Sequence, residues 1–124
     1  MRSIKPIERV IMTIHTLRRP ISAPELYKTE NLSNENKLVV EHYFLGSADW
    51  FVIEYDKAQD ICFGYARILE NCGEFGYFSM KELDELAVES LMQFGGLVTR
   101  FRNFVERDEF WSPTPVAEVL NGLD

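Results

Sequence analysis

The sequence contains few of the side chains that usually carry catalysis or bind metals. It has two cysteines, two histidines and two tryptophans in 124 residues. Cys62 and Cys72 match no zinc-ligand spacing, and His15 and His42 have no partner ligand at such a spacing. We therefore predict no metal and no cofactor, and we assign no catalytic residue. A nucleophilic pair of one cysteine with His42 stays geometrically open, although incidental thiols are the simpler interpretation.

The sequence also lacks long apolar runs and runs of like charge. Its longest apolar runs, such as Trp50 to Ile53, fall far short of the ~20 residues that cross a bilayer. The first residues show no apolar core of a signal peptide. We expect a cytoplasmic protein with two free thiols and no membrane contact.

Acidic residues outnumber basic ones, 20 to 13, which gives a formal net charge of −7. Binding to phosphate backbones depends on clustered Lys and Arg, so nucleic acid is a disfavoured partner. An acidic chain remains free to dock on a basic protein surface. Hydrophobic residues make up 46% and charged residues 27%, a globular balance that predicts a single domain over residues 1–124. The sequence leaves the oligomeric state open.

The first third of the chain predicts one helix and a connection. Residues 5–18 carry an apolar stripe at spacings of three and four, with Pro6 in the first turn and Pro20 after the end. Residues 21–36 are rich in turn-forming residues, with a short helical turn around residues 24–27.

A period of two then predicts four strands, at residues 37–45, 50–55, 61–69 and 75–78. Because short loops join them, we expect an antiparallel meander.

The second half predicts more helix. Ser79 and Glu82 have the spacing of a capping box, and an apolar stripe through Leu83, Leu86 and Leu91 indicates a helix over residues 80–91. Residues 97–104 are ambiguous but fit a helical stripe. Residues 105–110 are a final strand or an extended loop, and a short helix begins at Thr114 with Pro115. The predicted class is α+β: a mainly antiparallel sheet of four to five strands, with helices packed on one face.

Two charged clusters are candidate binding sites. Glu54 and Asp56 end the second strand, where they form either a paired-carboxylate site or ordinary turn chemistry. Glu106, Arg107 and Asp108 stand just before an aromatic pair. Arg107 either grips an anionic ligand or forms a structural ion pair, with Glu54 as the nearest partner by topology and Glu106 as the alternative.

Several motifs together resemble the family called domain of unknown function 2958. They are Pro24 to Glu30, Asn36 to Val40, Trp50 with Glu54 to Asp56, Phe63 to Tyr65, Glu74 to Ser79, Val105 to Asp108, and Pro113 to Pro115. The resemblance covers about residues 24–120, and Tyr27 in its first motif joins the candidate binding residues. It implies a small bacterial protein often associated with plasmids and phages, and no established activity. Residues 90–104 are longer than the family pattern, and the 5–18 helix lies outside it.

We therefore expect a non-catalytic interaction protein of a mobile genetic element, with a protein partner, which modulates or inhibits a host defence or replication protein. A first alternative is a small enzyme acting on an anionic small molecule through Glu54, Asp56, Glu106 and Asp108. A second is a nucleic-acid accessory protein that uses its arginines: Arg18, Arg19, Arg100, Arg102 and Arg107.

Overall fold

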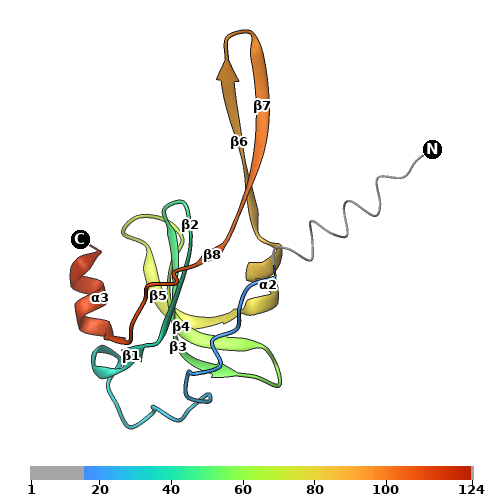
Figure 1. Cartoon of the computed structure of the whole chain (residues 1–124). Helices are drawn as coiled ribbons and strands as arrows, with labels where there is room; N and C mark the ends of the chain where they lie inside the picture. Colours follow the sequence, from blue (N-terminus) through green and yellow to red (C-terminus); the bar gives the residue numbers. More distant parts are fainter. Residues whose placement is uncertain (1–15, 124) are drawn as a thin grey trace.

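The computed structural model describes residues 16–123, which form three antiparallel sheets, two short α-helices and a 3-10 turn. Figure 1 shows the central sheet with a long hairpin rising from it. The elements in chain order are η1 (Asn34–Asn36), β1 (Leu38–Val39), β2 (Glu41–Leu45), β3 (Ala48–Asp56), β4 (Ile61–Arg67), β5 (Gly73–Ser79), α2 (Met80–Glu85), β6 (Ala87–Phe94), β7 (Leu97–Phe104), β8 (Glu106–Arg107), β9 (Thr114–Pro115) and α3 (Val116–Gly122).

The central sheet has the strand order β5-β4-β3-β2-β8, and each neighbouring pair is antiparallel. This confirms the predicted α+β class and the meander. The β2–β3 hairpin turns through Gly46 and Ser47, because Leu45 and Ala48 are paired residues. Gly46 has a φ of 60°, a left-handed conformation that glycine adopts without strain.

The predicted strand over residues 37–45 is interrupted at Val40. Leu38–Val39 pairs with Thr114–Pro115 in a separate two-stranded sheet, whereas β2 pairs with β3 and β8. The backbone N–H of Val40 still donates to the carbonyl of Val52 at 2.8 Å. The interruption directs β1 away from the main sheet toward the C-terminal segment, which it holds in place.

Strand β3 is buried on both of its faces, because successive side chains of a strand point to opposite sides. Each face has its own core. The first consists of Tyr43, Trp50, Val52, Tyr55, Cys62, Met80, Leu83 and Val105, and the second of Val39, Phe51, Ile53, Val116 and Val119. Helix α2 therefore covers one face of the sheet and α3 the other, instead of both packing on one face as we expected.

The helix expected over residues 80–91 is much shorter. Its start is as predicted, since Ser79 Oγ accepts a hydrogen bond from the backbone N–H of Glu82 at 3.3 Å. Helix α2 ends at Glu85, however, and strand β6 begins at Ala87. Leu86 is 40% exposed and Leu91 65%, so neither belongs to a buried stripe.

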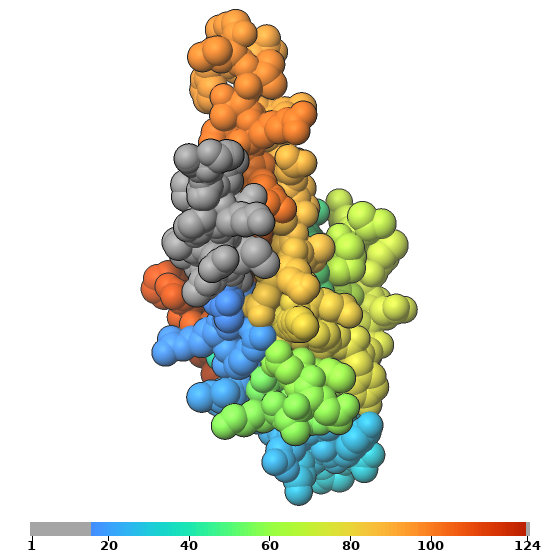
Figure 2. Space-filling view, turned by 90° about the vertical axis from the view of Figure 1, so that its right-hand side faces the viewer, coloured from blue at the N-terminus to red at the C-terminus, as the bar shows by residue number. Residues whose placement is uncertain are grey.

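Residues 87–104 form an extended two-stranded ribbon, so the helical interpretation of residues 97–104 is wrong. All eight residues of β6 pair with those of β7, and Gly95 and Gly96 form the turn. Gly95 has a φ of 60°, the conformation that two-residue hairpin turns require. We call this ribbon the arm. It projects well beyond the central sheet (Figures 1 and 2).

The helix predicted for residues 5–18 lies almost entirely outside the described residues, and residues 16–18 are not helical. Leu17 packs against the first core. The guanidinium of Arg19 bridges Asp60 and Asp84, at 2.9 and 2.7 Å from Nη2. These contacts raise the pKa of Arg19 and fix the start of the described chain beside α2.

The C-terminal segment crosses the second face. Only Glu106–Arg107 of the predicted 105–110 element is a strand, and Trp111 Nε1 donates to the carbonyl of Val39 at 3.0 Å. Helix α3 begins at Val116, because Thr114 and Pro115 pair with β1. Among the described residues, no helix has the length and apolar character needed to cross a bilayer.

Candidate functional site

Glu54 is a buried anchor for the loop that contains Tyr27. Its carboxylate accepts hydrogen bonds from the backbone N–H of Tyr27 at 2.9 Å and of Thr29 at 3.1 Å, and from the Thr29 hydroxyl. Glu54 is only 3% exposed, so these donors take the place of the water molecules that would otherwise hydrogen-bond to its carboxylate. Arg107 makes no ion pair with it, and our preferred pairing of Arg107 with Glu54 is wrong.

Tyr27 lies at the surface in a left-handed conformation, with a φ of 71°. Such a conformation is strained for a tyrosine and is kept here by the Glu54 contacts. The neighbouring Tyr27 side chain raises the pKa of Tyr77. Beside them the buried Lys37 donates to Thr29 Oγ1 at 3.1 Å and lies over the Phe63 ring. Sequence reasoning missed Thr29 and Lys37, although both lie in the family motifs.

Arg107 pairs with Glu41 across the β2–β8 edge of the sheet. Its Nε is 3.2 Å from Glu41 Oε1, and its Nη2 is 3.4 Å from Oε2. Arg107 is the paired residue of Tyr43, and Glu41 shares the face of Tyr43 two positions along β2. The pair therefore follows from the register, and it is a structural ion pair of the kind foreseen, with a different partner.

Asp108 belongs to a chain of polar contacts that sequence reasoning missed. Its Oδ2 is 3.0 Å from His42 Nδ1, and Asp49 Oδ1 is 2.8 Å from His42 Nε2. Asp49 continues the chain to Arg67 Nη2 at 3.2 Å, and the imidazole stacks on Phe51 with centroids 4.6 Å apart. Both ring nitrogens are occupied by carboxylates, so His42 has no free nitrogen to serve a nucleophile.

The remaining acidic candidates have ordinary or exposed positions. Asp56 accepts from the backbone N–H of Ala58 at 3.0 Å and from Gln59 Nε2 at 2.7 Å, which is turn chemistry. Glu106 is exposed. Within residues 16–123, no three His, Cys, Asp or Glu side chains are arranged to hold a metal ion. The four carboxylates therefore have separate partners or face solvent, and they do not converge on one cavity.

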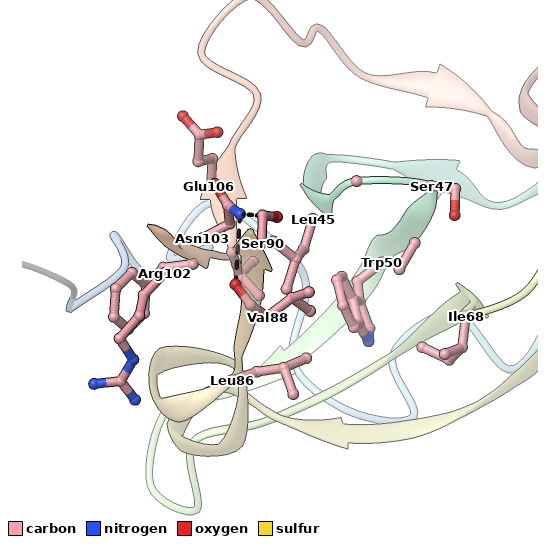
Figure 3. A pocket seen from close by; sticks show the side chains of 14 residues that line it. Leu45, Ser47, Trp50, Ile68, Leu86, Val88, Ser90, Arg102, Asn103 and Glu106 are labelled. Carbon is pink, nitrogen blue, oxygen red and sulfur yellow. Dashed lines mark hydrogen bonds between the residues drawn. The ribbon is translucent and has the colours of Figure 1, made fainter. Parts of the chain in front are cut away.

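A cleft of about 810 Å³ lies between the base of the arm and the β2–β3 turn. Figure 3 shows Leu45, Trp50, Ile68 and Leu86 gathered around it, with Val88 of the arm beside them. The lining is predominantly apolar, and the charged groups of Arg102 and Glu106 lie at one side in Figure 3. Such a cleft accepts apolar side chains.

The arm has two chemically different faces. Paired residues of an antiparallel ribbon share a face, and the faces alternate along each strand. One face, which we call the uncharged face, consists of Val88, Ser90, Met92, Phe94, Leu97, Thr99, Phe101 and Asn103. The other, which we call the charged face, consists of Ala87, Glu89, Leu91, Gln93, Val98, Arg100, Arg102 and Phe104.

The uncharged face is apolar and open to solvent. Five of its side chains are large hydrophobics whose exposed fractions range from 43% to 72%: Val88, Met92, Phe94, Leu97 and Phe101. Val88, Ser90 and Asn103 at its base also line the cleft, so the face and the cleft form one continuous surface. Contiguous exposed apolar patches are uncommon on monomeric soluble proteins, so this face is a candidate site. Sequence reasoning missed it because it read a buried helical stripe here.

The fold and this surface define a small α+β protein that carries an extended arm with an exposed apolar face. A family model described as "Protein of unknown function (DUF2958)" matches residues 15–118. The chain belongs to this family, which confirms the family predicted from the motifs, and residues 1–14 lie outside the match. No curated protein and no solved structure matches the chain.

Proposed function

We propose that this protein is a non-catalytic interaction protein that docks on a protein partner through the arm and the cleft at its base. The uncharged face carries this proposal, because an isolated two-stranded ribbon with large hydrophobics in water is only marginally stable. Burial of apolar side chains against a partner would stabilise the arm, at about 25 cal/mol per Å² of apolar surface.

The positions of the acidic residues lend less support to the enzyme alternative. A paired-carboxylate site needs its groups within reach of one substrate. Glu54 holds the Tyr27 loop, Asp56 closes a turn and Asp108 contacts His42, each with its own partners. Glu106 is the member of this set that lines the cleft.

The positions of the arginines lend little support to the nucleic-acid alternative. Arg19 is held by Asp60 and Asp84, and Arg107 by Glu41. Arg100 and Arg102 do lie on one face of the arm, but Glu89 is paired with Arg102 there. Two arginines beside an acidic residue make a weak phosphate-binding surface in a chain with a net charge of −7.

A more specific role follows only from the family resemblance. It implies a plasmid or phage protein, and we propose on that basis that the chain works in the cytoplasm by modulating a host defence or replication protein.

Affinity purification from the native cell, followed by mass spectrometry, tests the docking proposal. We expect the wild-type chain to retain a partner that the double variant Phe94→Asp/Leu97→Asp loses. The matched control, Leu91→Asp/Val98→Asp, puts the same charges on similarly exposed residues of the charged face and should retain the partner. Equal recovery with both double variants would contradict the proposal.

A further inference from the structure

We propose that the partner of the uncharged face is a second copy of this chain. Two arms would pack face to face in antiparallel orientation, so that the tip of each lies over the cleft of the other. This inference rests on the proposed docking function and names the occupant of the same surface.

Charge favours a second copy over a partner of opposite charge. Each chain carries a net charge of −7, so two copies repel one another through screened solvent, and a neutral contact surface adds no close contact between like charges. None of the residues of the uncharged face is charged, although Glu89, Arg100 and Arg102 lie on the other face of the same ribbon. A basic partner would gain no ion pair from such a face, whereas a second copy meets no like charge.

The order of side chains along the face suits a two-fold axis. From base to tip the paired rows are Val88 with Asn103, Ser90 with Phe101, Met92 with Thr99, and Phe94 with Leu97. A two-fold axis across the middle of the arm places the tip row of one copy over the base row of the other. Phe94 then meets Val88 of the second copy, and the polar residues Ser90 and Thr99 stay near the centre.

The amide donors of Asn103 at the base are already paired within one chain. Asn103 Nδ2 donates to Ser90 Oγ at 2.9 Å and to the carbonyl of Val88 at 3.4 Å. Covering Asn103 with an apolar tip therefore leaves neither of its N–H donors without an acceptor, which lowers the usual cost of burying an amide.

The surface is large enough for a specific dimer. Phe94 and Phe101 are aromatic side chains of ~150–250 Å², and Val88, Met92 and Leu97 are somewhat smaller. Because each of the five is exposed by about half, together they offer roughly 500 Å² per copy. Two such faces reach roughly 1,000 Å². Ile68 and Leu86 at the cleft are also exposed, and their burial under the partner's tip brings the total to the ~1,200 Å² of the smaller specific interfaces.

Analytical ultracentrifugation of the full chain over a wide concentration range tests this. We expect a monomer–dimer equilibrium that Phe94→Asp/Leu97→Asp weakens by about 100-fold or more, as two symmetric apolar contacts gain charges. Leu91→Asp/Val98→Asp should dimerise like the wild type. All substituted residues are exposed, so a cooperative melting transition for each variant would confirm that the variants fold.

Mixing two variants tests the antiparallel arrangement. Val88→Glu and Phe94→Lys should each be monomeric alone, because each places an unpaired charge against an apolar residue of the second copy. An equal mixture should dimerise, because Glu at position 88 of one copy then meets Lys at position 94 of the other. A mixture that stays monomeric would overturn the antiparallel pairing.

Self-association and docking on another protein are contradicted by different results. A full chain that is monomeric at every concentration overturns self-association. If the Phe94→Asp/Leu97→Asp variant then still loses a captured protein, the docking function stands with a different occupant. A dimer unaffected by the tip variant overturns the inference as well.

Discussion

Arg107 of β8 and Glu41 of β2 form an ion pair through both Nε and Nη2, at 3.2 and 3.4 Å, and so link the last strand of the central sheet to its neighbour. Their side chains are 23% and 12% exposed. Arg107→Ala should therefore lower the free energy of unfolding by more than the ~1 kcal/mol of an exposed pair and less than the ~3–5 kcal/mol of a buried one.

A double-mutant cycle identifies the partner of Arg107. Arg107→Ala and Glu41→Gln should couple, whereas Arg107→Ala and Glu54→Gln should add within ~0.5 kcal/mol in urea unfolding. Coupling of Arg107 to Glu54, together with additivity of Arg107 and Glu41, would show that Arg107 pairs with Glu54, the partner that the topology alone suggested.

Glu54→Ala should destabilise the fold by at least ~2 kcal/mol, because it leaves buried backbone donors of Tyr27 and Thr29 without an acceptor. The loop around Tyr27 should also become sensitive to limited proteolysis. Glu30→Ala is a suitable control, since Glu30 is exposed in the same loop. Equal stability of the Glu54 and Glu30 variants would mean that the carboxylate does not hold the loop.

Two leucines three residues apart in the predicted helical stripe should behave differently. Leu83 is 4% exposed in the first core, so Leu83→Ala should cost ~2–5 kcal/mol in the free energy of unfolding. Leu86 is 40% exposed, so Leu86→Ala should cost less than ~1 kcal/mol. If denaturant unfolding showed similarly large losses of the free energy of unfolding for both variants, the result would support the longer buried helix over residues 80–91.

The two thiols should differ in reactivity. Cys72 is exposed, whereas Cys62 is buried, and burial raises the pKa of Cys62 to about 12. At pH 8 iodoacetamide should modify one thiol in the native chain and both in urea, as read by mass spectrometry. Rapid native labelling of Cys62 would show that the first core is open.

The raised pKa also sets the sign of a pH dependence. In the unfolded chain the thiol ionises near its ordinary pKa of 9.0, well before the folded one. The contribution of Cys62 to stability is therefore fully present below about pH 9 and is lost as the pH rises toward 12.

The meander was predictable because its strands alternate with a period of two and are joined by short turns. The arm was not, because residues 80–91 satisfy a helical stripe through Leu83, Leu86 and Leu91 as well as they satisfy alternation. The Gly95–Gly96 turn favours the strand over the helix, because it lets β6 and β7 pair along their full length.

The sequence predicts that a given charged side chain forms an ion pair, but it does not predict which residue is the partner. An ion pair for Arg107 follows from its partly apolar surroundings, but the choice of Glu41 over Glu54 depends on the register between β2 and β8. The pairing of His42 with Asp49 and Asp108 depends on the same register, together with the β2–β3 hairpin. The contacts His42–Asp108 and Glu41–Arg107 each join residues 66 positions apart, so they leave no local pattern in the sequence.

Both proposals depend on the register that gives the arm an uncharged face, and a cross-strand disulfide tests it most directly. In a Cys72→Ser background, Met92→Cys/Thr99→Cys places two thiols on paired residues of that face. Paired strand residues have Cα separations within the ~4.4–6.8 Å that a disulfide allows. We predict rapid closure on mild oxidation for this pair, and none for Leu91→Cys/Thr99→Cys, whose thiols lie on opposite faces. Closure of the second pair in preference to the first would contradict the register and, with it, the uncharged face.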